Sequence, residues 1–308
     1  MDPVYSLPPV FRGPTADALP MAGEVNWGME KMGVDLLRTV TDGRGVKVGG
    51  VDTGVDATHP ILGNVAGVKD FTGSPVGAKD RHGHGTHIMG TIGGTDPRIG
   101  VAPGCTLYHG KGLGDSGSGG NGLIHAVNWC AEQGCEVISN SWGGGGRWPE
   151  WEREAIRLAE AGVWCIYAGG NAGPNTPDTD WPGRSEHVIN VAALNPDLSP
   201  ASFSSAGDKI DTSGPGVDIW SAKPGGGFQR MSGTSMATPF VAGLLTLYRA
   251  ALKAKGLPIP TIYELRKLLF SRSTDAHSPG DDRRTGPGWV TPLLLTLSLT
   301  PDPPPLGG

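Results

Sequence analysis

The chain has 308 residues, 37% hydrophobic and 18% charged, with a net charge of −5 at pH 7. That is enough apolar material for a sizeable core, and no Lys/Arg run forms a polyanion-binding patch, so nucleic acid is not expected as a partner. No segment approaches ~18 continuous apolar residues and the N-terminus lacks the pattern of a secretory signal, so we expect a soluble monomer without a membrane partner.

The chain divides into three parts. Residues 1–22 are rich in proline and lack periodicity, which predicts an extended N-terminal arm. Residues 23–300 are expected to form one large α/β domain, because strand and helix patterns alternate through them. Residues 301–308 are a Pro/Gly-rich tail that cannot pack as a helix or a central strand, and we expect it to be mobile.

Within the domain, apolar strand-like runs alternate with helical patterns, and this predicts a parallel sheet with helices on both faces. A capping box is expected at Thr261, because Glu264 follows it by three residues. The expected elements are a helix at 27–39, a strand at 46–51, a strand at 106–108, a helix at 120–133, a strand at 136–139, a helix at 149–161, strands at 163–168 and 188–192, a long helix at 234–254 and a helix from Thr261.

The four cysteines have no spacing typical of a disulfide framework, and Cys130 and Cys135 are not a CxxC pair. Cys165 lies in an apolar run and Cys105 opens a strand-like segment, so buried free thiols are favoured over disulfides. Free thiols favour a cytoplasmic location, while secretion stays open because a chain trimmed of its signal would look the same.

Three segments carry candidate chemistry. Asp52 stands where an apolar strand meets a polar turn, although a single Asp there is more typical of a turn or cap. His82, His84 and His87 lie in a Gly-rich stretch. Ser235 lies at the head of the long helix, where free N–H groups and the positive end of the dipole suit a developing oxyanion.

These segments resemble the three signature motifs of the subtilisin-like serine proteases (subtilases, peptidase family S8). The matching residues are Val51–Asp56, His84–His87 and Gly233–Pro239, in the order Asp, His, Ser. The segment Ala168–Gly173 resembles the family's oxyanion-asparagine loop. The resemblance implies a three-layer α/β fold and a serine endopeptidase that hydrolyses peptide bonds through an acyl-enzyme. It runs from about residue 27 to residue 295.

The resemblance also implies roles for individual residues. Ser235 is expected to be the nucleophile and His84 the general base that activates it. Asp52 is expected to orient the imidazole and to stabilise the imidazolium. The side-chain amide of Asn171 and the backbone N–H of Ser235 are expected to form the oxyanion hole.

In relatives the substrate lies extended between two backbone segments and pairs as an added strand. Trp142 departs from the aliphatic residue usual in one of them, and Asn121 stands where an aromatic residue often closes a distal pocket. The residues that the resemblance assigns to substrate binding are Gly117, Ser118, Gly119, Ser141, Trp142, Gly143 and Gly170, together with Asp180.

Asp180 precedes a Trp-Pro-Gly segment that resembles the family's Tyr-Pro-Gly segment. By that match its carboxylate falls at the base of the primary pocket, where it would favour Lys or Arg at P1, the residue on the amino side of the scissile bond. The alternative is a solvated loop aspartate.

The residues allow two kinds of metal site. A zinc site of His82, His84 and His87 has possible ligand spacings, but no carboxylate completes a motif such as HExxH. Many relatives bind a tight calcium, and here Ile61 occupies a ligand position while residues 93–100 are too short for the ligand loop. We therefore expect no required cofactor and no tight calcium site, although other Asp-bearing loops could hold calcium weakly.

Alternatives remain for the arm and for the reaction. The arm resembles in size the inhibitory extensions of intracellular relatives, and the other interpretation is an inert disordered arm. The same triad can pass the acyl group to an amine, so a leader peptidase or a peptide ligase (macrocyclase) is the runner-up. A catalytically inactive binding module is the third reading, although all four catalytic positions hold competent residues.

Overall fold

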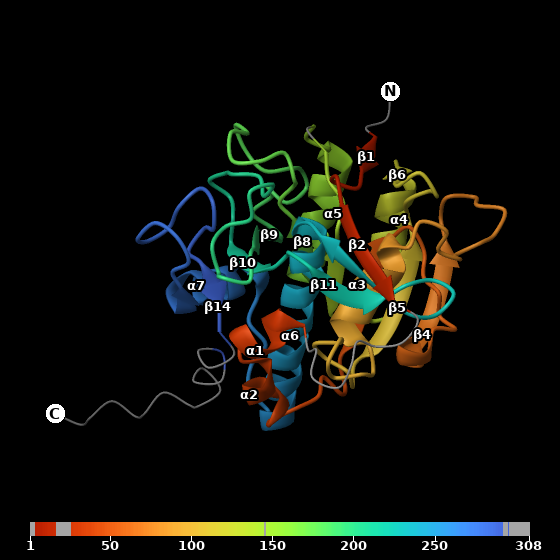
Figure 1. Ribbon diagram of the computed structural model, residues 1–308, viewed down its shortest axis with the longest axis horizontal. Coiled ribbons are helices and arrows are strands. Elements are labelled where there is room, and N and C mark those ends of the chain that lie inside the picture. The colour runs from red at the N-terminus through yellow and green to blue at the C-terminus, as the bar shows by residue number, and fades with distance from the viewer. Residues whose placement is uncertain (1–3, 17–25, 145, 292–294, 296–308) are drawn as a thin grey trace.

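A seven-stranded sheet forms the centre of the computed structural model, which describes residues 4–16, 26–144, 146–291 and 295 (Figure 1). Every neighbouring pair of its strands is parallel, as the sequence predicts. In spatial order the strands are β10 (Thr212–Pro215), β9 (Ile189–Leu194), β8 (Trp164–Ala168), β7 (Val137–Asn140), β3 (Lys47–Asp52), β5 (Thr106–Lys111) and β4 (Val65–Asp70).

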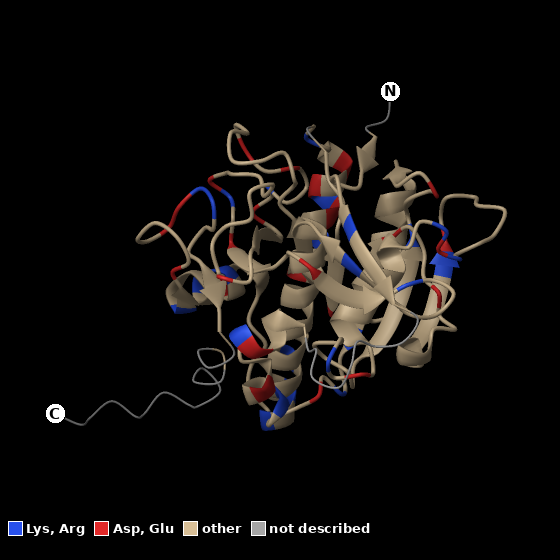
Figure 2. Cartoon of the chain, viewed as in Figure 1, with Lys and Arg blue, Asp and Glu red and all other residues tan. Residues whose placement is uncertain are grey.

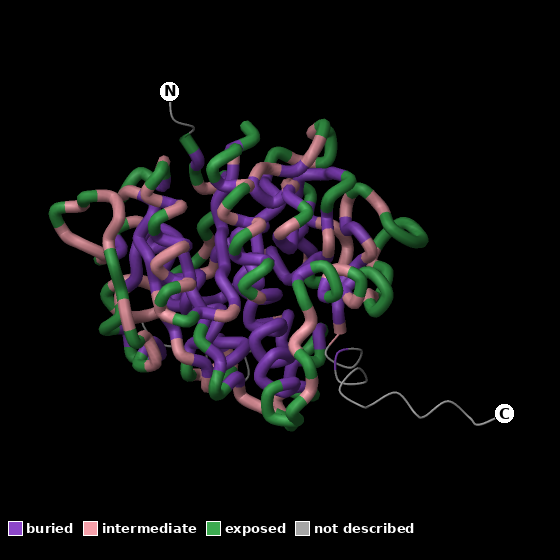
Figure 3. The backbone as a smooth tube through the Cα atoms, turned by 180° about the vertical axis from the view of Figure 1, so that it is seen from behind, coloured by how far each residue is buried: buried purple, intermediate pink, exposed green. Residues whose placement is uncertain are grey.

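Helices cover both faces of this sheet and enclose two apolar cores. The helices α3 (His84–Gly93) and α6 (Thr234–Lys255) contribute to the larger core, while α4 (Gly122–Glu132) and α5 (Pro149–Glu160) contribute to the second. Buried backbone accordingly runs through the middle of the molecule (Figure 3). The predicted three-layer α/β architecture is confirmed.

The single helix expected at residues 27–39 is wrong. It is two short helices, α1 (Trp27–Lys31) and α2 (Val34–Arg38), because Gly33 between them is left-handed with φ of +66°. The capping box is confirmed at α7 (Ile262–Arg272), where Thr261 Oγ1 accepts the N–H of Glu264 at 3.2 Å.

The arm contains two strands, β1 (Tyr5–Ser6) and β2 (Phe11–Ala16). β1 pairs with β6 (Ser118–Gly119), and β2 adds a third antiparallel strand to the hairpin of β11 (Ile219–Ala222) and β12 (Phe228–Ser232). Both lie against the domain (Figure 1). The tail at 301–308 lies outside the described residues. The remaining elements are η1 (Pro60–Leu62), β13 (Ser273–Thr274) and β14 (Trp289–Val290).

Charges of both signs are interspersed around the periphery of the molecule (Figure 2). The four cysteines are buried and carry free thiols. No helix in the described part of the chain is long and apolar enough to cross a membrane.

Candidate active site

Asp52 and His84 form a fully buried pair. Asp52 ends the interior strand β3 and His84 begins α3, and their Oδ1 and Nδ1 atoms lie 2.8 Å apart with neither side chain exposed. Burial raises the pKa of Asp52, but His84 and the N–H of Thr53 outweigh it and hold this pKa below its usual value. The carboxylate can therefore orient the imidazole.

A carboxylate that the sequence analysis did not single out ties these two segments together. Asp80 Oδ1 accepts the Thr53 hydroxyl at 3.0 Å and the N–H groups of His82 and Gly83 at 3.0 and 2.8 Å. Its Oδ2 accepts both the N–H and the hydroxyl of Thr86, at 2.8 and 2.7 Å. An Asp four residues before His84, ahead of a helix, is the capping signal that could have indicated this role.

Ser235 is the second residue of α6 and is fully buried. Its hydroxyl donates to the carbonyl of Ser141 at 3.3 Å, while the Ser141 hydroxyl donates to the carbonyl of Ser235 at 3.0 Å. His84 Nε2 is buried without a partner among the described residues. The structure thus links Asp52 to His84, but the predicted hydrogen bond between His84 and Ser235 is not among its interactions.

Asn171 has a defined side-chain orientation. Its Oδ1 accepts the N–H and the hydroxyl of Thr234 at 2.9 and 2.8 Å, which leaves the Nδ2 end facing the arm. Nδ2 donates to the carbonyl oxygen of Pro9 at 2.7 Å. An amide at the head of α6 therefore binds a backbone carbonyl.

The two predicted substrate segments flank the arm. Ser6 and Gly143 exchange two backbone hydrogen bonds of 3.0 Å, and the N–H of Leu7 donates to the carbonyl of Gly117 at 2.9 Å. Ser118 and Gly119 form β6, which pairs with β1. The arm is thus an added strand between the segments expected to bind a peptide.

Beyond Asn171 the arm continues along β12, with Phe11 opposite Ser232. The Arg12 guanidinium donates to the carbonyl of His82 at 2.8 Å and to Gln229 Oε1 at 3.3 Å. His82 is therefore a loop residue in contact with the arm.

Asp180 lies between two glycines from the predicted pocket walls. A Cβ on Gly143 would lie 2.8 Å from the Asp180 Cβ, and a Cβ on Gly170 would lie 2.6 Å from its Oδ2. Burial raises the pKa of Asp180. Among the described residues, its carboxylate has neither a hydrogen-bond donor nor a cation beside it.

Two further histidines are buried. His87 lies buried in α3, with Nε2 at 2.9 Å from the carbonyl of Ile219, and burial lowers its pKa to about 3. His109 on β5 has no partner for either ring nitrogen within the described chain, and burial lowers its pKa to about 4. No motif in the sequence points to His109.

Within residues 4–16, 26–144, 146–291 and 295, no three His, Cys, Asp or Glu side chains are grouped as metal ligands would be. Ile61, the residue expected at the position of a calcium ligand in relatives, is buried in η1.

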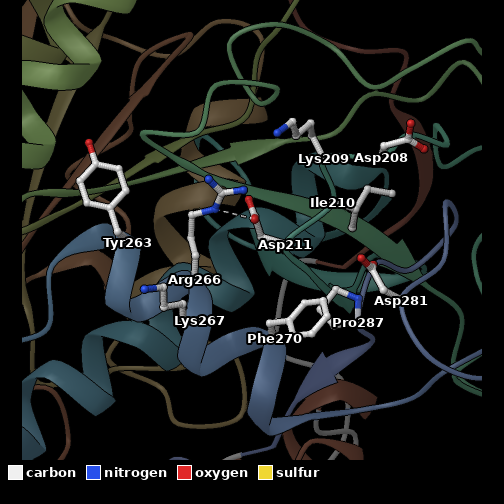
Figure 4. Close-up of a pocket in the computed structure, with 10 residues that line it drawn as sticks. All are labelled: Asp208, Lys209, Ile210, Asp211, Tyr263, Arg266, Lys267, Phe270, Asp281 and Pro287. Atoms are coloured by element: carbon white, nitrogen blue, oxygen red, sulfur yellow. Dashed lines mark hydrogen bonds and ion pairs between the residues drawn. The ribbon is translucent and has the colours of Figure 1, made fainter.

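A separate pocket of about 350 Å³ lies between α7 and residues 208–211, which directly precede the edge strand β10 (Figure 4). Arg266 crosses it to Asp211, with Nε and Oδ1 2.7 Å apart. None of the predicted catalytic residues lines it.

A parallel sheet covered by helices, which carries a buried Asp–His pair together with a serine at a helix head, is typical of an α/β serine peptidase. Residues 43–288 match the model of the subtilase family. The chain therefore belongs to the subtilase family, and it is a subtilisin-like serine endopeptidase.

Relatives agree with this assignment. The chain is 38% identical over 255 residues to an intracellular serine protease of Paenibacillus polymyxa, with 78% of each chain covered. It is 33% identical to subtilisin DY of Bacillus licheniformis, covering 80% of this chain and 89% of the relative. Identity to a subtilisin of Bacillus pumilus is 37%, covering 75% and 85%.

Proposed function

We propose that Asp52, His84 and Ser235 are the catalytic triad of this endopeptidase and that Asn171 and the Ser235 N–H form its oxyanion hole. The observation that carries this proposal is the 2.7 Å hydrogen bond from Asn171 to the Pro9 carbonyl at the head of α6. That amide is oriented by Thr234 before any substrate binds, as electrostatic stabilisation of an oxyanion requires.

The reaction begins when the Ser235 hydroxyl turns from the Ser141 carbonyl to His84 Nε2. His84 takes the hydroxyl proton while Oγ attacks the peptide carbonyl, and the oxygen that becomes negative faces Asn171. His84 then gives the proton to the leaving amine, and the acyl-enzyme remains. Water, deprotonated by the same imidazole, releases the acid. Asp52 keeps Nδ1 protonated throughout.

A fluorophosphonate probe tests the assignment. It should modify Ser235 alone and block proteolysis, and peptide mapping should find no adduct in a Ser235→Ala variant. Labelling elsewhere with activity intact would disprove the triad. The masses of peptide products separate hydrolysis from the alternative, a leader peptidase or peptide ligase, which would yield joined products. An inactive binding module would give neither an adduct nor a product.

A preference for Lys or Arg at P1 belongs to the same proposal. It is supported by the half-buried carboxylate of Asp180, which lies between Gly143 and Gly170 and has no counter-charge in the described part of the chain. A guanidinium entering the pocket would supply that charge and form charge-assisted hydrogen bonds. Matched peptides with Arg or Phe at P1 test it, and a wide margin for Phe would remove the idea.

We also propose that the arm inhibits the enzyme. If the antiparallel pairing of Ser6 with Gly143 is continued by two residues, Pro8 falls opposite Ser141. The carbonyl of Ser141 also accepts the Ser235 hydroxyl. Pro8 has no N–H for that carbonyl, and Asn171 binds the carbonyl of Pro9 instead. The arm therefore binds like a substrate peptide on both sides of Ser235. Its register differs by one residue between the two sides, because Pro8 is opposite Ser141 but Asn171 binds the carbonyl of Pro9.

Removing residues 1–20 tests inhibition. The truncated chain should turn over a peptide substrate at least tenfold faster than the full chain at low substrate concentration, because the groove no longer has to be vacated. Unchanged turnover would support an inert arm.

The remaining proposals concern location, assembly and metals. The buried free thiols, and a relative named an intracellular serine protease, support a cytoplasmic location. For its assembly we propose a monomer. The missing family ligand at Ile61 supports an enzyme that needs no tight calcium, so activity and melting temperature should withstand a chelator.

A further inference from the structure

A buried histidine lies on the sheet one step before Asp52. His109 of β5 pairs with Gly50 of β3, and Asp52 is two residues further along the same strand. Side chains two residues apart on a strand point to the same face of the sheet, so His109 and Asp52 share a face. The helix α3 packs on this face, because a Cβ on Gly50 would collide with Met89 Sδ.

The nitrogen-bearing edge of the His109 ring faces β3 and the start of α3. A Cβ on Gly50 would lie 3.2 Å from His109 Nδ1, and a Cβ on Gly85 would lie 3.2 Å from His109 Cε1. Cε1 is the ring atom between the two nitrogens, and Gly85 directly follows His84. Two glycines thus give the ring room beside the segments that carry Asp52 and His84.

Two complementary polar groups are left without partners here. Asp52 Oδ2 and both ring nitrogens of His109 are buried and have no hydrogen-bond partner among the described residues. Folded proteins almost always pair such groups, either directly or through an ordered water molecule. A carboxylate oxygen accepts and an imidazole N–H donates, so each of these two groups can supply what the other needs.

His109 is suited to this role because it stays neutral. Burial lowers its pKa to about 4, although Asp52 and Asp80 act to raise it, and Lys111 lowers it further. A cationic His109 would compete with the imidazolium of His84 for the charge of Asp52. A neutral ring has one N–H donor, which can hold the carboxylate and leave its charge in place.

We propose that His109 is a positioning residue for the triad, and that its ring N–H donates to Asp52 Oδ2, directly or through one buried water. Oδ1 is already held by the N–H of Thr53 at 2.7 Å and by His84 at 2.8 Å. A donor on Oδ2 would fix the other end of the carboxylate and so prevent its rotation. This inference rests on the proposed function and adds to it a residue that acts through Asp52.

Steady-state kinetics on the full chain provide the first test. His109→Leu removes both ring nitrogens at similar volume, and His109→Gln keeps an N–H donor. We expect His109→Leu to lower kcat by about 10–100-fold, the value of a hydrogen bond to a charged group, and His109→Gln to stay within about threefold of the wild type. KM should not change, because no arm residue that lies in the peptide groove contacts His109 through a hydrogen bond in the described chain.

The pH profile separates positioning from simple packing. A carboxylate that loses a hydrogen-bond donor is a stronger base, and it stabilises the neighbouring imidazolium more strongly. The acid limb of kcat/KM should therefore move to higher pH in His109→Leu and stay in place in His109→Gln. Leu107→Val is the matched control, since Leu107 is buried on the same face of β5. It should lower the melting temperature without moving the acid limb.

An unchanged kcat with an unmoved acid limb in His109→Leu, or equal losses in His109→Leu and His109→Gln, would overturn the inference and leave the proposed function standing. If the wild type itself cleaves no peptide, the proposed function fails instead. A measurement that requires no catalysis then decides on His109 alone.

That measurement is the proton NMR spectrum of the full chain carrying Ser235→Ala. The resonance of the proton between Asp52 and His84 should shift when His109→Leu is added and should stay in place with Leu107→Val. Asp52→Asn, which leaves His109 intact, should shift the resonance of the His109 ring N–H, so the test does not depend on the folding of a His109 variant. Resonances that stay in place with His109→Leu or with Asp52→Asn would overturn the inference.

Discussion

The two halves of the arm on either side of Ser235 are bound in different ways. Upstream, Tyr5 is fully buried and the backbone pairs with the domain on both edges, at Gly117 and at Gly143. Downstream, within the described part of the chain, β2 pairs along one edge with β12, and Phe11 remains 52% exposed.

The difference shows where selection is concentrated in the groove. Among the described arm residues, those that are buried, Tyr5 and Pro8, lie upstream on the side of Asp180, whereas the side chains of β2 are exposed or partly covered. We therefore expect substrate preference to be strong before the scissile bond and weak after it.

Ser235→Ala should have the largest effect. It should lower kcat by about 10⁶-fold, the loss that a subtilisin suffers when its catalytic serine or histidine is removed. Both halves of the arm should keep their hydrogen-exchange protection, because neither is held by the serine hydroxyl. Steady-state kinetics and exchange on the same variant check this, and residual activity near the wild-type level would refute the role of Ser235.

Asn171→Ala should lower kcat by about 10²–10³-fold, or ~2.7–4 kcal/mol, which is the cost of losing the equivalent amide in subtilisin. KM should change little, since the donor acts on the oxyanion. The variant also removes the contact with Pro9 that joins the two halves of the arm. A rise in KM with kcat unchanged would place Asn171 in substrate binding only.

Asp180→Asn should reduce the preference for Arg over Phe at P1 by about 30-fold, or about 2 kcal/mol, because a charge-assisted hydrogen bond is lost. The ratio of kcat/KM for two matched peptides measures this. Asp197→Asn, on an exposed turn, is the control and should leave the ratio unchanged. A ratio that does not move would make Asp180 an ordinary loop residue.

The preference for Arg should also depend on pH. Burial raises the pKa of Asp180, so the carboxylate is protonated, and the preference lost, at a higher pH than for an ordinary aspartate. Because the folded state binds this proton more tightly than the unfolded state, ionisation destabilises the fold as pH rises through the raised pKa. Asp180→Asn should therefore melt higher than the wild type above that pH, but not below it. Peptide selectivity and melting curves between about pH 4 and pH 8 follow both effects.

Arg12→Ala should have the smallest effect. Its hydrogen bonds to His82 and Gln229 lie at the surface, where such contacts contribute little. Basal turnover of the full chain should rise by about twofold, far less than after removal of residues 1–20. An equal or larger rise would mean that the downstream half holds the arm in place.

Sequence patterns predict the sheet and indicate the candidate site, but they do not predict the path of the arm. The apolar run into Asp52 predicts β3, and the three motifs indicate which strand ends and helix heads should meet. The arm has no periodicity, so nothing in it indicates that Tyr5 is buried or that Pro9 faces Asn171. Those contacts depend on pairing between residues more than a hundred positions apart, which local patterns do not encode.

Asp80 has a consequence for how the enzyme loses activity. Its carboxylate accepts hydrogen bonds from the turn after β3 and from the start of α3. If either segment moved alone, the buried carboxylate would lose hydrogen bonds, which is energetically costly. We therefore expect the turn after β3 and the start of α3 to lose their structure together on heating or in denaturant.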